Sequence, residues 1–218
     1  MRNALDFSGK VVLVTGGGGG IGRGIAEGFD QCGAQVVVAE IDPARADATR
    51  TALGTASLVS VTDVRDSAGV DALLREVVSR YGRLDVLVNN VGDFLGIVKP
   101  LEEYSDEDFD ALFAVNLRQV FQVTRSVLPL MKKTGPGGSI ISVSSIEAFR
   151  GIPMNIVYSA FKAGITGFTK SLALELGPSG IRVNAIAPET TESEQVKPSA
   201  WIPEQYREHI ARWIPLGR

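Results

Sequence analysis

A short apolar run that leads directly into a glycine stretch most constrains the fold of this chain. Val11–Thr15 reads Val-Val-Leu-Val-Thr, the composition of a short strand that is buried on both faces. Gly16–Gly22 follows with Ile21 as its one non-glycine residue, and apolar side chains then recur at helical spacing, as at Ile25 and Phe29. A flexible linker lacks core-forming segments on both sides. The pattern therefore predicts a strand, a tight glycine turn and a helix.

The glycine turn is itself a candidate binding site. Because glycine has no Cβ, the backbone N–H groups of such a turn can approach a pyrophosphate at the positive end of the following helix. We therefore expect a cofactor to contact Gly16, Gly20, Ile21 and Gly22.

Short apolar runs and helical patterns alternate along the rest of the chain. Strands are expected near residues 11–15, 35–40, 57–61, 84–89, 138–143 and 181–187. Helices are expected near residues 21–32, 43–53, 67–81, 106–132 and 156–177. This alternation predicts an α/β fold with a doubly wound parallel sheet of the Rossmann type, in one domain over residues 1–218. We expect a single crevice where the strands end, at Thr15, Glu40, Asp63, Asn89, Ser145 and Pro188.

Composition narrows the class of protein. The chain has 218 residues, is 44% hydrophobic and carries a formal net charge of −3, which fits one domain with a substantial core. The slightly acidic balance argues against a nucleic-acid partner. No apolar run reaches the length of a membrane span, and no secretory pattern opens the sequence, so we expect a cytoplasmic protein. The one histidine, His209, has no neighbours at metal-ligand spacing, so no metal is expected.

A second group of residues indicates acid–base chemistry. Tyr158 and Lys162 are four residues apart on a predicted helix, so their side chains leave one face of it. Lowering a tyrosine pKa from about 10 to about 7 requires roughly 4 kcal/mol, which one cation about 4 Å away nearly supplies at an effective dielectric of about 20. Ser145 follows an apolar strand and can hold a substrate oxygen near the phenol. A tyrosine and a lysine four residues apart also occur on solvent-exposed helices with no catalytic role, so the pair alone is weak evidence for acid–base chemistry.

With these motifs in order, the chain resembles the short-chain dehydrogenase/reductase family. The cofactor signature of that family corresponds to Thr15-Gly16-x-x-x-Gly20-Ile21-Gly22, and its Asn-Asn-Ala-Gly segment corresponds to residues 89–92. The catalytic residues of the family correspond to Asn116, Ser145, Tyr158 and Lys162. The resemblance covers residues 9–218.

The resemblance implies an oxidoreductase that interconverts a secondary alcohol and a ketone by hydride transfer. Tyr158 would move the proton and Ser145 would orient the substrate oxygen. Lys162 would lower the phenol pKa and hold the nicotinamide ribose. Asn116 would anchor a water, although an asparagine in a long helix can also satisfy a kinked backbone.

The resemblance also implies further cofactor contacts. Asp63 and Val64 would contact adenine, but a strand-end acid can equally be a solvated loop residue. The remaining implied contacts are Asn90 and Pro188. Two positions depart from the family pattern. Val91 replaces the usual alanine, which should only tighten packing, and Glu189 replaces the usual glycine beside the nicotinamide, which leaves the local backbone and charge open.

Glu40 bears on which dinucleotide binds. At the end of the second predicted strand, its carboxylate can accept hydrogen bonds from the adenosine ribose and would repel a 2′-phosphate. No lysine or arginine lies within Gly17–Gly19 or directly after Glu40. The residues therefore favour NAD, with NADP as the alternative. Asp42 could share the ribose, but Asp42-Pro43 is more simply a helix cap followed by proline at the first helical position.

Residues 189–218 resemble the substrate lid of the family. The candidate substrate residues are Phe94, Phe149, Arg150, Met154, Glu189 and Trp201. Their aromatic character suggests an apolar alcohol of moderate size as substrate, although aromatic residues also pack cores. Arg150 could instead bind an anionic acyl carrier, which keeps an NADP-dependent 3-ketoacyl reductase open. A catalytically silent dinucleotide-binding scaffold is the other alternative, because fold does not imply function.

Two expectations concern assembly and chain length. The helix expected near 156–177 is apolar around most of its circumference, and such helices are usually buried on most sides. We therefore expect a homodimer or homotetramer, which the resemblance also implies. The sequence stops at Arg218 within the predicted lid, and in the family a helix and a seventh strand follow. We expect the native chain to continue by on the order of 30 residues.

Overall fold

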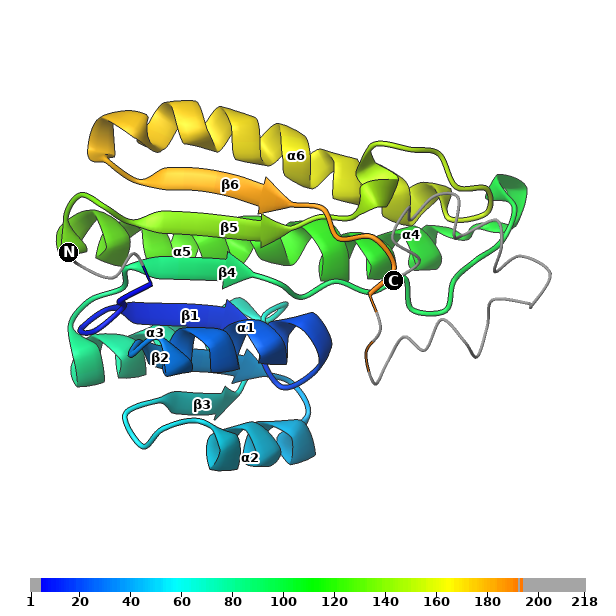
Figure 1. Ribbon diagram of the computed structural model, residues 1–218. Coiled ribbons are helices and arrows are strands. Elements are labelled where there is room, and N and C mark those ends of the chain that lie inside the picture. Colours follow the sequence, from blue (N-terminus) through cyan, green and yellow to red (C-terminus); the bar gives the residue numbers. More distant parts are fainter. Residues whose placement is uncertain (1–4, 192, 194–218) are drawn as a thin grey trace.

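The computed structural model describes residues 5–191 and 193, and its centre is a parallel sheet of six strands (Figure 1). The spatial order of the strands is β3-β2-β1-β4-β5-β6, and every neighbouring pair is parallel. The strands are β1 (Val11–Thr15), β2 (Gln35–Glu40), β3 (Leu58–Val61), β4 (Val86–Asn89), β5 (Ser139–Val143) and β6 (Arg182–Ile186). The predicted Rossmann-type sheet is confirmed, and each predicted strand overlaps an observed one.

Helices connect consecutive strands and cover both faces of the sheet (Figure 1). They are α1 (Gly20–Gln31), α2 (Pro43–Ala52), α3 (Ser67–Tyr81), α4 (Asp106–Phe113), α5 (Gln119–Thr134) and α6 (Ile156–Leu176). Short 3₁₀ turns lie at η1 (Leu101–Glu103), η3 (Ile146–Ala148) and η4 (Gly177–Ser179). As predicted, Asp42 caps α2 by accepting hydrogen bonds from two backbone N–H groups, with Pro43 at the first helical position.

The helix predicted near 106–132 is interrupted. A π-helical segment, η2 (Ala114–Arg118), separates α4 from α5. Its cause is visible at Asn116, whose Nδ2 donates to the Leu112 carbonyl 2.9 Å away and to the Asp93 carbonyl 2.8 Å away. A side-chain amide that bonds the carbonyl four residues back competes with the α-helical ladder. A side chain tied to a neighbouring loop therefore accounts for the break.

Two apolar layers enclose the sheet. On one face, Ala26 of α1 and Ala46 of α2 pack against alternate valines of the central strands. On the other face, α3, α5 and α6 bury larger side chains such as Met131 and Leu176. Strands covered on both faces read as continuous apolar runs, which is why β1 was recognisable in the sequence. Because all strands are parallel, their carboxyl ends lie along one edge of the sheet.

β6 is an edge strand within the described residues, since it pairs only with β5 there. Only Val183 of its five residues is buried. None of the described helices is both long enough and apolar enough to span a lipid bilayer.

Two glycines of α1 differ in the room around them, and this predicts opposite effects of alanine. A Cβ on Gly22 would lie 2.1 Å from the Gly16 carbonyl oxygen, whereas a Cβ on Gly24 would meet nothing within 4 Å. We expect Gly24→Ala to stabilise the fold by about 0.5–1 kcal/mol through helix propensity. Gly22→Ala should destabilise it by about 1–3 kcal/mol through overpacking against backbone. Urea unfolding of both variants checks this, and equal shifts of the two midpoints would contradict the close approach.

Candidate active site

The glycine turn after β1 is locked to the end of β4 by one asparagine. Asn90 Nδ2 donates to the carbonyl oxygens of Thr15 and Gly16, at 3.0 and 3.1 Å. In return, Thr15 Oγ1 accepts from the backbone N–H of Asn90 at 3.0 Å. Gly16 and Gly20 have φ angles of +62° and +51°, the left-handed region that favours glycine. The Cγ2 of Val91 lies against Gly16, so the valine tightens this packing as expected.

Glu40 closes the other side of the turn. Its side chain is buried at the end of β2, and Oε2 accepts a hydrogen bond from the Gly18 N–H at 2.9 Å. Oε1 accepts from the Asp42 N–H at 3.1 Å. A Cβ on Gly18 would lie 2.5 Å from Glu40 Oε2, so only glycine leaves this approach open. The turn therefore presents bare backbone beside a carboxylate, a donor set that fits the pyrophosphate and ribose of a dinucleotide.

Arg45 is a cation near the turn that the sequence did not reveal. It stands in the first turn of α2, five residues after Glu40, and a Cβ on Gly19 would lie 3.7 Å from its Nη1. Arg45 lies neither within the glycine turn nor directly after Glu40 in the sequence. The curve of the chain from β2 into α2 returns Arg45 to the turn, so spacing alone could not place it.

The adenine residues expected from the resemblance are divided between surface and core. The Asp63 carboxylate pairs with the Arg65 guanidinium at 2.8 Å, and this hydrogen bonding lowers the pKa of Asp63 below its usual value. Val64 is buried in the core with residues of α3. A contact between Val64 and adenine would therefore have to come from its backbone, and both contacts stay predictions.

The end of β5 and the first turns of α6 bring Ser145, Tyr158 and Lys162 together. Ser145 caps η3, and its Oγ accepts the backbone N–H of Glu147 at 3.2 Å. Tyr158 lies one turn before Lys162 on α6, and the Lys162 Nζ lies 5.5 Å from the centroid of its ring. Phe94 meets the same ring edge-on, with centroids 6.5 Å apart. Ser145, Tyr158 and Lys162 thus lie together beside the carboxyl ends of the strands.

Lys162 is buried, with 2% of its surface exposed. Its Nζ donates to the Val143 carbonyl at 3.1 Å, and a Cβ on Gly92 would lie 2.4 Å from that nitrogen. The glycine of the Asn-Asn-Val-Gly segment therefore makes room for the ammonium. Burial lowers the pKa of Lys162 to about 8, while the charges of Asp93 and Glu147 oppose the decrease.

The expected lowering of the Tyr158 pKa is wrong for this arrangement. Burial, followed by the negative charges of Glu147 and Asp93, raises the pKa of the phenol to about 12. A hydrogen bond with Ser145 works the other way. The Lys162 ammonium lies 5.5 Å from the ring centroid and donates to the Val143 carbonyl. Desolvation and the two acids therefore outweigh the lysine.

Asn116 holds the loop that follows β4. Besides its two donor bonds, its Oδ1 accepts the backbone N–H of Asp93 at 3.1 Å. A Cβ on Gly92 would lie 3.1 Å from the same oxygen, so Asn116 borders the space beside Lys162. The structure thus shows the backbone role that the sequence left open, and the water-anchoring role stays a prediction.

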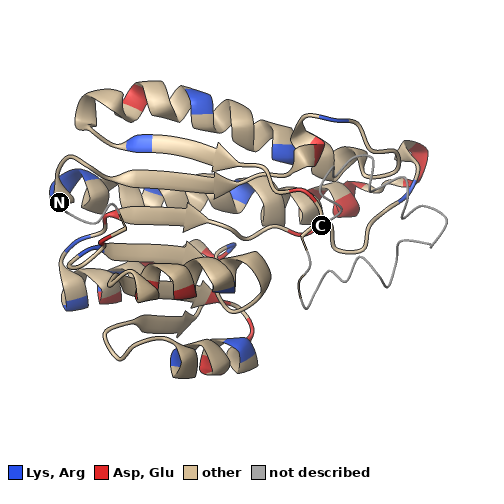
Figure 2. Ribbon diagram, in the orientation of Figure 1, with Lys and Arg blue, Asp and Glu red and all other residues tan. Residues whose placement is uncertain are grey.

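Two of the residues expected to contact the substrate form an ion pair with each other. Arg150 and Glu189 form a two-pronged ion pair, with N–O distances of 2.8 and 2.9 Å. The Pro188 carbonyl accepts the Ile146 N–H at 3.0 Å, which joins the end of β6 to the turn that Ser145 caps. Figure 2 shows acidic segments near the arrowhead ends of β5 and β6. Glu189 therefore engages the one cation that the sequence assigned to an anionic substrate.

The apolar candidates on this side are open to solvent. Phe149 is 66% exposed and Met154 is 44% exposed, so neither belongs to the core. Met154 has a φ of +66°, rare for a non-glycine residue, and its carbonyl accepts hydrogen bonds from the Lys99 N–H and the Tyr104 hydroxyl. Trp201 and most of the predicted lid lie outside the described residues. Over the part of the chain that the structure covers, no cluster of three or more potential metal ligands occurs.

Comparisons with known proteins agree with this geometry. The short chain dehydrogenase family matches residues 10–201. A 3-oxoacyl-(acyl-carrier-protein) reductase of Thermotoga maritima is 40% identical, and a galactitol 2-dehydrogenase of Agrobacterium fabrum is 35% identical. Each alignment covers 98% of this chain and 86% of the relative. The crystal structure of a 3-ketoacyl-(acyl-carrier-protein) reductase from Brucella melitensis complexed with NADH superposes with a TM-score of 0.85 at 35% identity, covering 98% of this chain and 86% of that one.

The fold, the glycine turn and the family match define an oxidoreductase that acts on CH–OH groups. The chain belongs to the short-chain dehydrogenase/reductase family.

The buried lysine predicts a pH-dependent stability. The pKa of Lys162 is about 8 in the folded chain, against an ordinary value of 10.5. Between these two pH values the lysine is therefore mostly protonated in the unfolded chain and mostly deprotonated in the folded chain. The stability of the wild type should therefore fall as the pH decreases from about 10.5 to about 8, by on the order of 3 kcal/mol, and then level off.

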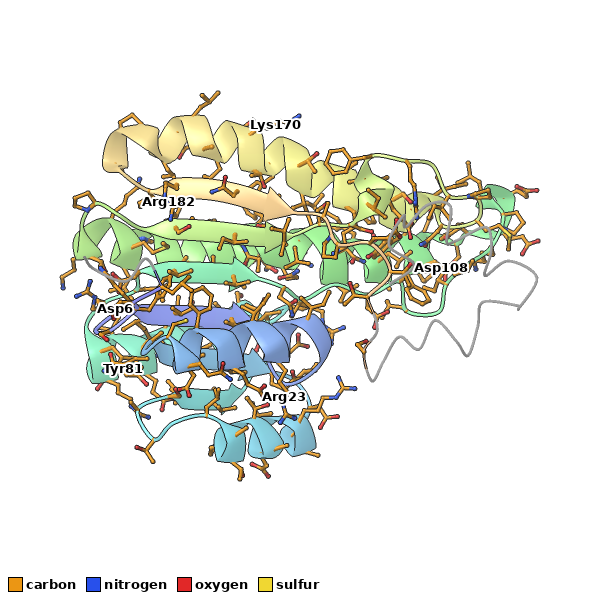
Figure 3. The ribbon with its side chains drawn as sticks, in the orientation of Figure 1. Asp6, Arg23, Tyr81, Asp108, Lys170 and Arg182 are labelled. Carbon is orange, nitrogen blue, oxygen red and sulfur yellow. The ribbon has the colours of Figure 1, made fainter. Side chains whose placement is uncertain are left out.

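Lys162→Met lacks this group, so its stability relative to the wild type should increase over the same decrease in pH. Urea unfolding at several pH values measures the difference. Lys170→Met, at an exposed position of α6 (Figure 3), controls for the loss of a lysine from that helix. Parallel stability curves for wild type and Lys162→Met would contradict the buried, weakly basic lysine.

Proposed function

We propose that the chain is an NAD(H)-dependent oxidoreductase that interconverts a secondary alcohol and a ketone. The observation that carries this proposal is the meeting of Ser145, Tyr158 and Lys162 at the strand edge that also holds the glycine turn. Turn and acid–base group thus lie along one edge of the sheet, which supports a shared site where a cofactor and a substrate could exchange a hydride.

The residues of the strand edge would hold the dinucleotide. The turn from Gly16 to Gly22 would bind the pyrophosphate and Glu40 the adenosine ribose, with Asn90 fixing the turn. Asp63, Val64 and Pro188 would border the two ends of the cofactor, and Lys162 would reach the nicotinamide ribose. The bound nicotinamide would supply the hydride-carrying carbon. The complex of the Brucella melitensis relative with NADH supports a nicotinamide cofactor.

The side chains of the protein would supply the proton and would orient the substrate oxygen. With its pKa raised to about 12, the Tyr158 phenol is protonated at neutral pH and can donate to a ketone oxygen. Ser145 Oγ accepts the Glu147 N–H and its hydroxyl interacts with the Tyr158 phenol, so one substrate oxygen could meet both hydroxyls. Asn116 would anchor a water that links Lys162 to solvent.

Two charged groups bear on cofactor choice. Glu40 is buried at the end of β2, where the adenosine ribose would lie, and its carboxylate would repel a 2′-phosphate, which favours NAD. Arg45 lies near Gly19 and could pair with that phosphate if the carboxylate were removed. NADP therefore stays the alternative.

Two other functions deserve comparison. A 3-ketoacyl reductase is supported by relatives of that name, but the Arg150 guanidinium that would meet an acyl carrier is engaged by Glu189. A silent dinucleotide-binding scaffold has no use for a buried lysine beside a tyrosine, because the burial costs stability. Turnover of a panel of neutral secondary alcohols against an acyl-carrier ketoester, followed by the absorbance of reduced cofactor, separates the three functions.

Assembly and location stay predictions of the same proposal. A homodimer or homotetramer is supported by two phenylalanines that lie about half exposed, Phe109 of α4 and Phe121 of α5. Exposed aromatic residues on helices are typical of subunit interfaces. The cytoplasmic location follows from the sequence argument alone.

Replacing the proposed proton donor should abolish most of the activity. Tyr158→Phe should lower kcat for ketone reduction by roughly 10²–10⁴, the usual contribution of a positioned acid–base group, and leave cofactor affinity nearly unchanged. Steady-state kinetics and cofactor titration measure both. Tyr81→Phe is the matched control, because Tyr81 ends α3, far from the carboxyl ends of the strands, and its phenol donates to the Ala56 carbonyl (Figure 3). Near wild-type turnover by Tyr158→Phe would refute the mechanism.

Glu40 predicts a change of selectivity. Glu40→Ser removes the repulsion and one charged hydrogen-bond acceptor, so the ratio of kcat/KM for NADP to that for NAD should rise by roughly 10- to 100-fold. The added change Arg45→Gln should reverse most of the gain in NADP, since it removes the nearby cation. A wild-type preference for NADP would overturn the assignment of NAD.

A further inference from the structure

Glu147 connects the two segments that carry the candidate catalytic residues. It lies in η3, and its backbone N–H donates to Ser145 Oγ at 3.2 Å. Its Oε2 accepts two hydrogen bonds from the beginning of α6, from Ser159 Oγ at 2.8 Å and Asn155 Nδ2 at 2.9 Å. Ser159 directly follows Tyr158 in the sequence. One residue therefore bonds the serine and the turn that carries the tyrosine.

We propose that Glu147 is a positioning residue of this active site, whose carboxylate ties the Ser145 segment to the first turn of α6. The proposal rests on the proposed function, in which Ser145 and Tyr158 act on one substrate oxygen. Neither the motif spacing nor the family signature assigns Glu147 a part, since it is neither a strand end nor a member of the four matched residues.

The geometry shows why such a tie is needed. Ser145 extends from β5 through a short turn, whereas Tyr158 belongs to a helix that begins eleven residues later, at Ile156. The connection includes exposed Phe149 and Met154, so apolar packing does not fix it. The Glu147 carboxylate is half-buried and accepts both bonds through one oxygen, which sets the distance between the two segments directly. A misplacement of about 1 Å between reacting groups can cost roughly 10²-fold in rate.

The charge of the same carboxylate supplies an independent readout. Tyr158 is faced by Lys162 on its own helix, by Ser145 and Glu147 from the β5–α6 connection, and by Asp93 from the loop after β4. Burial is the largest cause of its raised pKa, and Glu147 is the next. The pKa of Glu147 is itself raised by burial, with Ser159, Asn155 and Arg150 opposing the increase and Glu189 adding to it. Removing the charge must therefore lower the pKa of Tyr158.

Three variants separate the tie from the charge. Glu147→Gln keeps an acceptor for Ser159 and removes the charge, so kcat at its optimum should change less than about threefold while the Tyr158 pKa decreases. Glu147→Ala removes both, so kcat should fall by roughly 10- to 100-fold with a smaller change in KM. Ser159→Ala removes one bond and keeps the charge, so kcat should fall slightly and the pH profile should not move. Wild-type kcat in Glu147→Ala would overturn the proposal.

A readout without turnover keeps this test distinct from that of the proposed function. The phenol of Tyr158 is titrated by NMR of protein labelled at tyrosine ring carbons, with its resonance assigned by its loss in Tyr158→Phe. A lower phenol pKa in Glu147→Gln and an unchanged one in Ser159→Ala support the placement of the carboxylate beside Tyr158. An unchanged pKa in Glu147→Gln would overturn it, even if no substrate were ever found. Should Glu147→Ala fail to fold, Glu147→Gln and Ser159→Ala still decide the outcome.

Discussion

The hydrogen bonds of Asn90 to the carbonyls of Thr15 and Gly16 are the constraint on which the rest of the site depends. They hold the turn after β1 against the end of β4, and Gly22 can then pack against the turn because it has no Cβ. The first helix therefore begins at the carboxyl edge of the sheet, with its free N–H groups and positive end at that edge. The Asn90 side-chain amide donates to backbone carbonyls, so its contribution to cofactor binding would be indirect.

Lys162 shows the opposite use of a polar side chain. Its ammonium is buried, bonded to one carbonyl and fitted into space that Gly92 leaves empty. The low pKa that results means that the fold loses stability by holding a cation there at neutral pH. A buried charged side chain that lowers the stability of the fold, at a position where an uncharged side chain could pack, is typical of a functional site. That argument is independent of the motif spacing.

Much of the fold was readable from the sequence because buried parallel strands and amphipathic helices carry separate patterns. The break at Asn116 was not readable, since it depends on a bond to Asp93 across a loop. For the same reason, Arg45 and Glu147 escaped notice: each reaches the site by the path of the chain through space. The direction of the Tyr158 pKa was missed because pairwise charge arithmetic between Tyr158 and Lys162 omitted desolvation and the neighbouring acids.

Burial acts on Tyr158 and Lys162 in opposite directions, and both shifts favour the uncharged form. At neutral pH the pair is therefore a protonated phenol beside a lysine that is still largely cationic. Removing the proton from that phenol at pH 7 costs on the order of 7 kcal/mol, at about 1.36 kcal/mol per unit below a pKa of about 12. In ketone reduction the phenol starts in this protonated form, whereas in alcohol oxidation it must lose its proton before it can act as a base. The charges of Glu147 and Asp93 thus help to keep the phenol in the protonated form that ketone reduction uses at neutral pH, and the deprotonated form that alcohol oxidation uses becomes more populated as the pH rises.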